Sequence, residues 1–134
     1  MKSIPAPDVQ LKLADIIETL ELDHVSAERL HCMRTQGART RAYARIWSLP
    51  SIWRQALSQD VAYIIEVISE RYDELSLEDQ ERVLIHELMH IPAGFSGGLV
   101  PHLCAGRRIN SASVERLHRE YSVRKKERVN RFSP

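Results

Sequence analysis

Hydrophobic residues recur at two different periods along this chain, and the two periods predict different elements. Near the N-terminus they lie three or four positions apart, the spacing of an amphipathic helix, over residues 9–22. The residues that carry this pattern are Leu13, Ile16, Ile17 and Leu20. Close to the other end, a more charged helix is predicted over residues 113–126, with Val114, Leu117 and Tyr121 on its inner face.

Three segments between these helices have the features of β-strands. Residues 28–35 alternate in polarity, residues 41–49 are rich in aromatic side chains, and residues 61–69 form a continuous β-branched run. Strands and helices of this length in one short chain favour the α+β class. We expect a small twisted sheet of about three strands packed against two or three helices.

The segment around Pro50 separates two of these strands. Proline cannot donate a ladder hydrogen bond, so Pro50 should end the strand before it. Ser51 is a candidate N-cap for a short helical turn over residues 51–57. Trp47 and Trp53 flank this proline, and we expect both to pack in the core under the sheet.

A further helix is predicted between Ser76 and Pro92. Ser76 can cap its first turn, and Asp79 stands at the capping-box position, where Glu or Gln is usual. Pro92 ends the helix, because proline has no amide hydrogen to donate. The residues expected on its buried face are Leu77, Leu84, Leu88 and Ile91.

This helix carries the sequence His86-Glu87-Leu88-Met89-His90, which matches the H-E-x-x-H pattern. Residues four positions apart share one face of a helix, so His86 and His90 can bind one zinc ion. Glu87 can reach a water molecule at the metal and act as its general base. The spacing therefore predicts a zinc-dependent hydrolase with one Zn²⁺ per chain.

A catalytic zinc site needs a third protein ligand and an open fourth position. Metzincins have a third histidine six residues after the second, and Ser96 stands at that position here. We favour His102, because the glycine-containing loop before it could bend back toward the helix. Glu115 is the main alternative, a glutamate on the following helix as in gluzincins, and Glu120 and Cys104 stay open.

The sequence LIHELMHIPAGFSGGLVPH, with the segments before it, resembles a family of small metallopeptidases from archaea and phages. These are similar to minimal zincins and, more distantly, to SprT-like proteases. The resemblance covers about residues 30–121. It implies a minimal zincin fold, with a short twisted sheet, an active-site helix and a C-terminal helix, and it implies hydrolysis of peptide bonds in a peptide or protein substrate.

The resemblance also implies roles for particular residues. His86 and His90 would be ligands and Glu87 the general base, while SprT-like proteins take a third histidine from a later loop, as His102 would be. Zincins bind substrate as an extra strand at a sheet edge, here either residues 28–35 or residues 41–49. A peptidase must also stabilise an oxyanion, for which Tyr121, His118 or a nearby arginine could assist.

Composition narrows the class of protein further. The 134 residues suffice for one domain, residues 1–134, and the two cysteines cannot form a disulfide framework. No apolar run approaches the roughly 20 residues of a membrane-spanning helix. The first residues lack the apolar stretch of a signal peptide, so we expect a cytoplasmic protein without membrane partners.

The net charge of +1 is unevenly distributed. The C-terminal third is basic, with its basic side chains at residues 107–131, and the rest of the chain is acidic. This segment raises the alternative of a nucleic-acid-binding module. Acidic residues interrupt it, which favours a solvated helix face or one docked on the acidic part of the domain. Residues 122–134 could form a flexible tail that lies in the cleft or across a homodimer partner. A catalytically inactive zinc-binding interaction domain is the third alternative.

Overall fold

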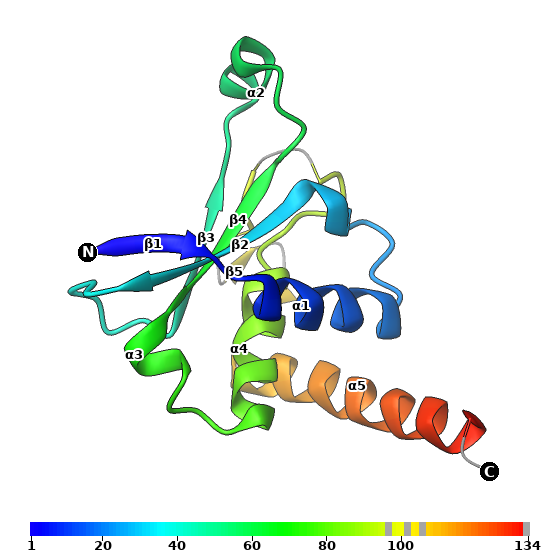
Figure 1. Ribbon diagram of the computed structural model, residues 1–134. Helices are drawn as coiled ribbons and strands as arrows, with labels where there is room; N and C mark the ends of the chain where they lie inside the picture. Colours follow the sequence, from blue (N-terminus) through cyan, green and yellow to red (C-terminus); the bar gives the residue numbers. More distant parts are fainter. Residues whose placement is uncertain (96–97, 101–102, 105–106, 133–134) are drawn as a thin grey trace.

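A four-stranded sheet is the frame on which the helices are arranged (Figure 1). The computed structural model describes residues 1–95, 98–100, 103–104 and 107–132. The sheet has the order β1-β2-β4-β3, with β2 parallel to β4 and the outer strands antiparallel to their neighbours. The strands are β1 (Lys2–Pro5), β2 (Leu30–Gln36), β3 (Ala44–Ser48) and β4 (Tyr63–Ile68). Strands β1 and β3 therefore form the two edges.

The α+β class is confirmed, but the sheet has four strands where about three were predicted. The unpredicted strand, β1, is short and wholly exposed, so it has no buried face to give an alternating pattern. It is held by pairing with β2, including a 2.7 Å hydrogen bond between the hydroxyls of Ser3 and Thr35. Two further paired strands of two residues each follow the glycine-containing loop and were not predicted. They are β5 (Leu103–Cys104) and β6 (Arg107–Arg108).

The helices begin at or within two residues of their predicted starts. Helix α4 ends at Leu88, however, and not at Pro92 as predicted, because the chain tightens into three-residue hydrogen bonds before the proline. The hydroxyl of Ser76 accepts a 3.1 Å hydrogen bond from the backbone N–H of Asp79, which confirms the predicted cap. Pro50, not Ser51, occupies the N-cap position of the short helix after β3, because the Pro50 carbonyl accepts its first helical hydrogen bonds. The helices are α1 (Pro7–Thr19), η1 (Ala27–Arg29), α2 (Ser51–Leu57), α3 (Ser69–Tyr72), α4 (Leu77–Leu88) and α5 (Ser111–Phe132).

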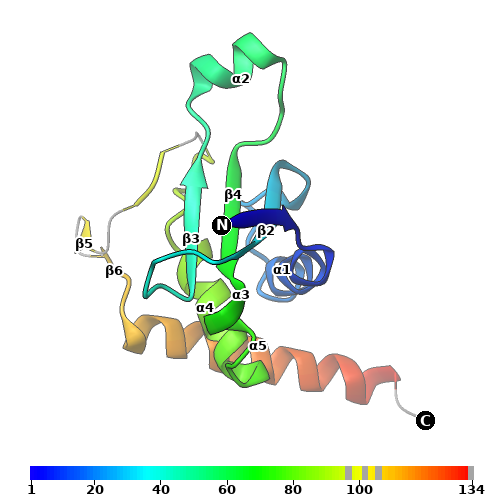
Figure 2. The ribbon, with the colours of Figure 1, turned by 60° about the vertical axis from the view of Figure 1, so that its left-hand side comes forward.

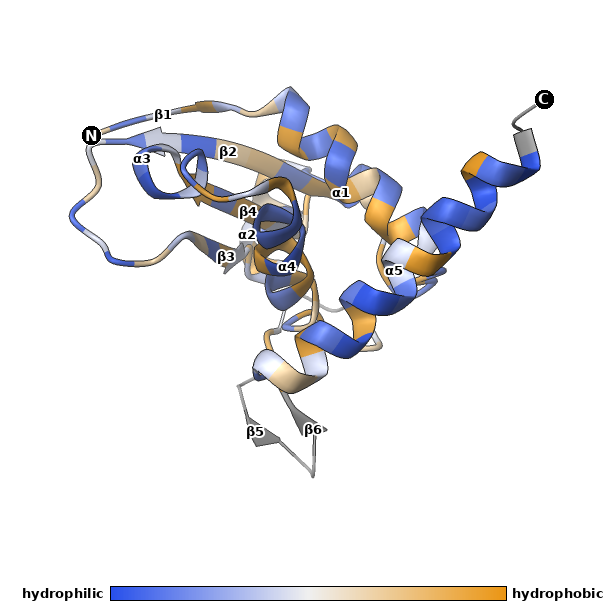
Figure 3. Ribbon diagram, turned by 90° about the horizontal axis from the view of Figure 1, so that it is seen from below, coloured by the Kyte–Doolittle hydropathy of each residue, from blue (hydrophilic) through white to orange (hydrophobic). Residues whose placement is uncertain are grey.

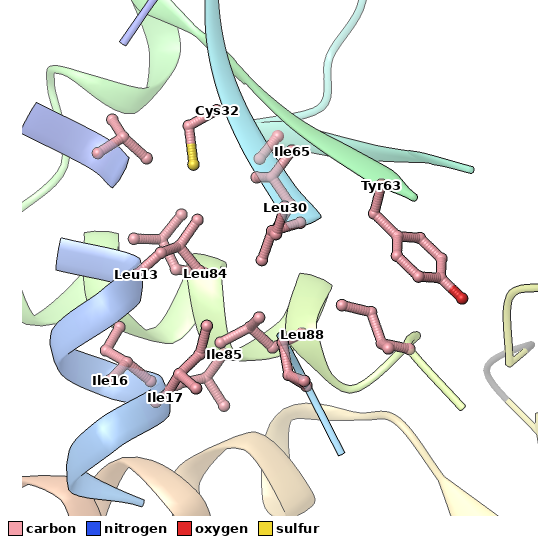
Figure 4. Packing of buried hydrophobic residues seen from close by; sticks show 14 of the residues in the cluster. Leu13, Ile16, Ile17, Leu30, Cys32, Tyr63, Ile65, Leu84, Ile85 and Leu88 are labelled. Carbon is pink, nitrogen blue, oxygen red and sulfur yellow. The ribbon is translucent and has the colours of Figure 1, made fainter. Parts of the chain in front are cut away.

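The core lies between one face of the sheet and helices α1 and α4 (Figure 4). Inward-facing side chains of β2 and β4 meet the apolar faces of both helices, and each fully buried aliphatic side chain contributes about 1.5–3 kcal/mol. Leu77 was expected on the buried face of α4 but is 54% exposed, because it stands in the first turn beyond the sheet. The labelled core residues include Leu13, Ile16, Leu30, Ile65, Leu84 and Leu88.

The opposite face of the sheet is organised around a buried carboxylate, Glu66. This side chain accepts hydrogen bonds from Thr35 Oγ1 (2.5 Å), Arg45 Nε (3.0 Å) and Trp47 Nε1 (2.9 Å). Burial alone would raise the pKa of Glu66, but these three hydrogen bonds outweigh burial and lower it. Glu66 thus ties the edge strand β3 and the inner strand β2 to β4.

The prediction that Trp47 and Trp53 pack in the core is wrong. Trp47 is 52% exposed and Trp53 is 57% exposed. Alternation along β3 puts Ile46 toward the helices, so Trp47 lies on the other face. Trp53 is on α2, which stands away from the domain at the end of β3 and β4 (Figure 2).

Helix α5 crosses below α1 and α4 and extends past α1 toward the C-terminus (Figure 3). Its basic side chains bind acidic groups of the domain: Arg128 pairs with Asp15 at 3.1 Å and Lys125 with Glu81 at 3.7 Å. Tyr121 also donates a hydrogen bond to Asp15. The interpretation of the basic segment as a helix docked on the acidic part of the domain is confirmed. In the ranges described, no helix is long and apolar enough to span a membrane.

Replacing Glu66 by glutamine should destabilise the protein by about 2 kcal/mol at neutral pH, because hydrogen bonds to a buried charge are lost. Since the folded-state pKa is lowered, ionised Glu66 stabilises the fold above its unfolded-state pKa, and this stabilisation is lost as pH falls through the folded value. Urea unfolding at neutral and acid pH should therefore show a smaller acid loss for Glu66→Gln than for wild type. Glu28→Gln, at an exposed position, is the control; equal acid losses in both variants would contradict the assignment.

Candidate active site

The two motif histidines lie side by side at the C-terminal end of α4. Their ring centroids are 5.3 Å apart. His86 is in the last turn of α4 and is half-buried, whereas His90 follows the helix and is 8% exposed. The N–H of His90 donates to the Glu87 carbonyl, three residues back, so the helix tightens as it ends. The predicted convergence of His86 and His90 is thus present although the motif is at the end of the helix.

A pair of hydrogen bonds to Val100 fixes the ring of His90. The backbone N–H of Val100 donates to the His90 carbonyl at 2.7 Å, and His90 Nδ1 lies 2.5 Å from the Val100 carbonyl oxygen. A carbonyl only accepts, so Nδ1 must carry the hydrogen and the ring lone pair is on Nε2. Metal-binding histidines commonly donate one ring N–H to a carbonyl in this way and bind through the other nitrogen.

Phe95 and Gly98, which lie between His90 and Val100, contact β4. Tyr63 of β4 donates a 2.8 Å hydrogen bond from its hydroxyl to the Gly98 carbonyl. Its ring lies 4.9 Å from the ring of Phe95, which Arg29 covers from a distance of 5.2 Å. Phe95 is buried and has a positive φ of 48°, an uncommon conformation held by these contacts. The loop therefore returns to the end of α4, as predicted, as far as Val100.

Glu87 is buried beside the two histidines. Its side chain is 9% exposed, and burial raises the pKa of its carboxyl group to about 7. Within the ranges described, no side chain or backbone group hydrogen-bonds to this carboxylate. A buried acid whose pKa is close to neutrality can both accept and return a proton, which is the property required of a general base.

The candidate third ligands differ in whether the structure describes them and in the partners they have. His102 lies outside the described residues, as does the side chain of Cys104. Glu115 accepts a 2.8 Å hydrogen bond from Arg82 of α4, and this interaction lowers the pKa of Glu115. Glu120 pairs with Arg124 at 2.7 Å. Among the residues the structure describes, no three His, Cys, Asp or Glu side chains converge on one point as a metal site would require.

The side chains considered for oxyanion stabilisation have other partners. His118 Nε2 lies 2.9 Å from Glu81 Oε1, and both side chains are buried between α4 and α5. Tyr121 donates its hydroxyl hydrogen to Asp15 of α1. The first contact joins α5 to α4 and the second joins α5 to α1, so both hold α5 against the domain.

Two contributors to the site were not predicted from the sequence. The sequence pattern predicts only that Tyr63 belongs to a strand and that Val100 belongs to a loop. Val100 contributes backbone groups, which no side-chain pattern reveals. An aromatic residue with a hydroxyl at the start of a buried strand is a weak signal for Tyr63, because such hydroxyls need a partner.

Comparison with known protein families agrees with the geometry of this site. The model of the family described as "Putative phage metallopeptidase" matches residues 1–121, so the chain belongs to this family. Membership implies a metal-dependent peptidase and a peptide or protein substrate. No significant match is found among curated proteins or among solved structures.

Removing the Tyr63 hydroxyl should loosen the loop that returns to His90. Tyr63→Phe deletes one hydrogen bond worth about 1 kcal/mol, so the Val100 amide should exchange its hydrogen about five-fold faster. Hydrogen exchange followed by NMR measures this directly. Tyr43→Phe removes an equivalent hydroxyl from a half-exposed ring elsewhere and should leave Val100 unchanged. Unchanged exchange in Tyr63→Phe would show that Tyr63 does not restrain the loop.

Proposed function

We propose that this protein is a zinc-dependent peptidase of the minimal zincin type, with His86 and His90 as ligands and Glu87 as general base. The observation that carries the proposal is the arrangement of these three residues at the C-terminal end of α4. The rings of the histidines are 5.3 Å apart, and His90 has its lone pair on Nε2. The buried Glu87 carboxyl group lies between them in sequence with a pKa near 7.

In this proposal the bound metal and Glu87 have separate roles in hydrolysis. When bound, zinc would supply a Lewis acid that makes water a usable nucleophile near neutral pH. Glu87 accepts a proton from the attacking water and later delivers it to the nitrogen of the leaving amine. The burial of Glu87, which raises the pKa of its carboxyl group to about 7, supports its role as general base.

The substrate would bind along the free edge of β3. Of the two edge strands considered from the sequence, β2 is interior and β3 is at the edge beside α4. The ladder with β4 uses the backbone groups of alternate residues, including those of Tyr43 and Leu49. The N–H and C=O groups of Ala44, Ile46 and Ser48 therefore point away from the sheet and can pair with an extended peptide.

His102 is the third ligand we favour. Val100 is tied to His90, and two residues of chain span at most about 7 Å. Glu115 is held by Arg82 and would have to break that ion pair to bind a metal. The position of Val100 supports a ligand from the segment after it over one from α5.

Glu87→Gln should keep the zinc and abolish cleavage of an unstructured protein substrate, because glutamine cannot accept the proton. Metal analysis of wild type and variant should find one zinc ion per chain. Glu78→Gln makes the same change at an exposed position of α4 and should keep full activity. Cleavage by Glu87→Gln at the wild-type rate would rule out its role as general base.

His102→Ala should weaken zinc binding by at least about 100-fold, whereas Glu115→Ala should leave it nearly unchanged. Competition with a chromogenic chelator measures both affinities. His31→Ala, at an exposed position of β2, controls for loss of any histidine. A large loss in Glu115→Ala with none in His102→Ala would exchange the two assignments, and equal affinities would exclude both.

A further inference from the structure

Helix α2 is amphipathic, but its apolar face is turned toward solvent. Ile52, Trp53 and Leu57 are 69%, 57% and 55% exposed, and no residue of α2 is buried. At 100° per residue these three side chains lie on one side of the helix. The polar residues Ser51 and Arg54 instead line a hollow within the β3–β4 connection. An ordinary surface helix has the reverse orientation.

Such a helix is incomplete without a partner. It has 7 residues, fewer than the roughly 12 that an isolated helix needs to be marginally stable in water. It stands at the far end of β3 and β4, away from the other described elements (Figure 2). Something outside the described residues must cover this face if its three large side chains are to leave water.

The size of the face argues against a stable dimer. The three side chains have about 200 Å² of surface each and are roughly half-exposed. Together with the exposed part of Trp47 they offer roughly 400 Å², which is half of the area that one partner contributes to a typical stable interface. Residues 37–59 contain four arginines and no Asp or Glu, and one of these arginines, Arg45, is paired with Glu66 of β4, so the segment keeps a positive charge.

The same charge favours an acidic partner, and the neighbouring strand favours an extended one. Only Leu49 and Pro50 separate β3 from α2. A peptide paired with the outward groups of Ala44, Ile46 and Ser48 would continue directly onto the apolar face of the helix. Arg39 and Arg41 precede β3, at the end of the strand opposite α2, and they are exposed and have no ion pair within the described residues. They would contact the part of the peptide that lies farthest from the helix.

We infer that the apolar face of α2, formed by Ile52, Trp53 and Leu57, is an exosite for unfolded polypeptides that combine apolar and acidic side chains. The inference rests on the proposed function for the course of the peptide along β3. Five residues of substrate cover β3, and about five more reach across α2. Substrates of about ten residues or more use the exosite, and shorter ones do not.

The test compares an exosite variant with a matched control. Ile52→Ser/Trp53→Ser/Leu57→Ser removes the apolar face, and Trp53→Ala is a milder second variant that keeps the helix. Leu11→Ser/Val129→Ser changes two equally exposed side chains on α1 and α5. Each of these variants is made in the wild-type background to measure kinetics and in the Glu87→Gln background to measure binding. The probes are a fluorescent twelve-residue peptide of alternating Leu/Phe and Asp/Glu, its Lys-containing counterpart, and a five-residue peptide.

We expect the triple variant to raise the Kd and KM for the acidic long peptide at least about ten-fold, with kcat unchanged. The short peptide and the control variant should show no change, and the Lys-containing peptide should bind weakly to every form. Equal binding of the acidic peptide to wild type and triple variant would overturn the exosite.

Other occupants give different results and would also overturn it. A wild-type dimer that the triple variant dissociates in sedimentation would make the face a contact between copies. Variant-sensitive binding to phosphatidylcholine–phosphatidylglycerol vesicles or to a single-stranded oligonucleotide, without peptide binding, would assign it to those partners. Because binding is measured in Glu87→Gln, α2-dependent binding without cleavage by wild type would refute the peptidase and leave the exosite standing.

Discussion

Two hydrogen bonds between His90 and Val100 are the constraint on which the candidate site depends. They use both backbone groups of Val100, one for the carbonyl of His90 and one for its ring. The first stops the end of α4 from fraying, where unpaired carbonyls would otherwise need water. The second selects the tautomer of a buried imidazole. A single residue without a functional side chain therefore sets the helix end, the ring and the course of the loop together.

The fold has to hold α4 rigidly, because the burial of Glu87 works against it. An acid with a pKa near 7 is one that the surrounding protein does not stabilise in its ionised form. The opposing contributions come from the rest of the helix. Leu84 and Leu88 are buried against the sheet, and Glu81 pairs with His118 of α5. The unfavourable position of one carboxylate is thus offset along three turns of the helix that carries it.

Sequence patterns predicted the elements whose side chains are sorted by burial. The helix with the motif, the β-branched strand β4 and the inner face of α5 all have such patterns, and all are confirmed. Strand β1 was missed because pairing with β2, not burial, holds it. The prediction for Trp47 and Trp53 fails because a large aromatic side chain does not itself show that its position faces the core. Composition cannot say which face of β3 a side chain occupies when the strand is at an edge.

For the site, the H-E-x-x-H spacing predicted that the rings of His86 and His90 lie close together, and they are 5.3 Å apart although His90 follows the helix. The return of the loop could be predicted only in outline, since a tyrosine hydroxyl and backbone groups far apart in sequence bring it about. Charge was the least direct guide. The basic C-terminal segment raised the alternative of nucleic-acid binding, yet Arg128 and Lys125 have acidic partners inside the domain. Arg39 and Arg41, in a stretch without acidic residues, have none within the described ranges. Arginines indicate a partner when the fold leaves their charge uncompensated, and that condition holds for Arg39 and Arg41 before β3 but not for Arg128 and Lys125 of α5.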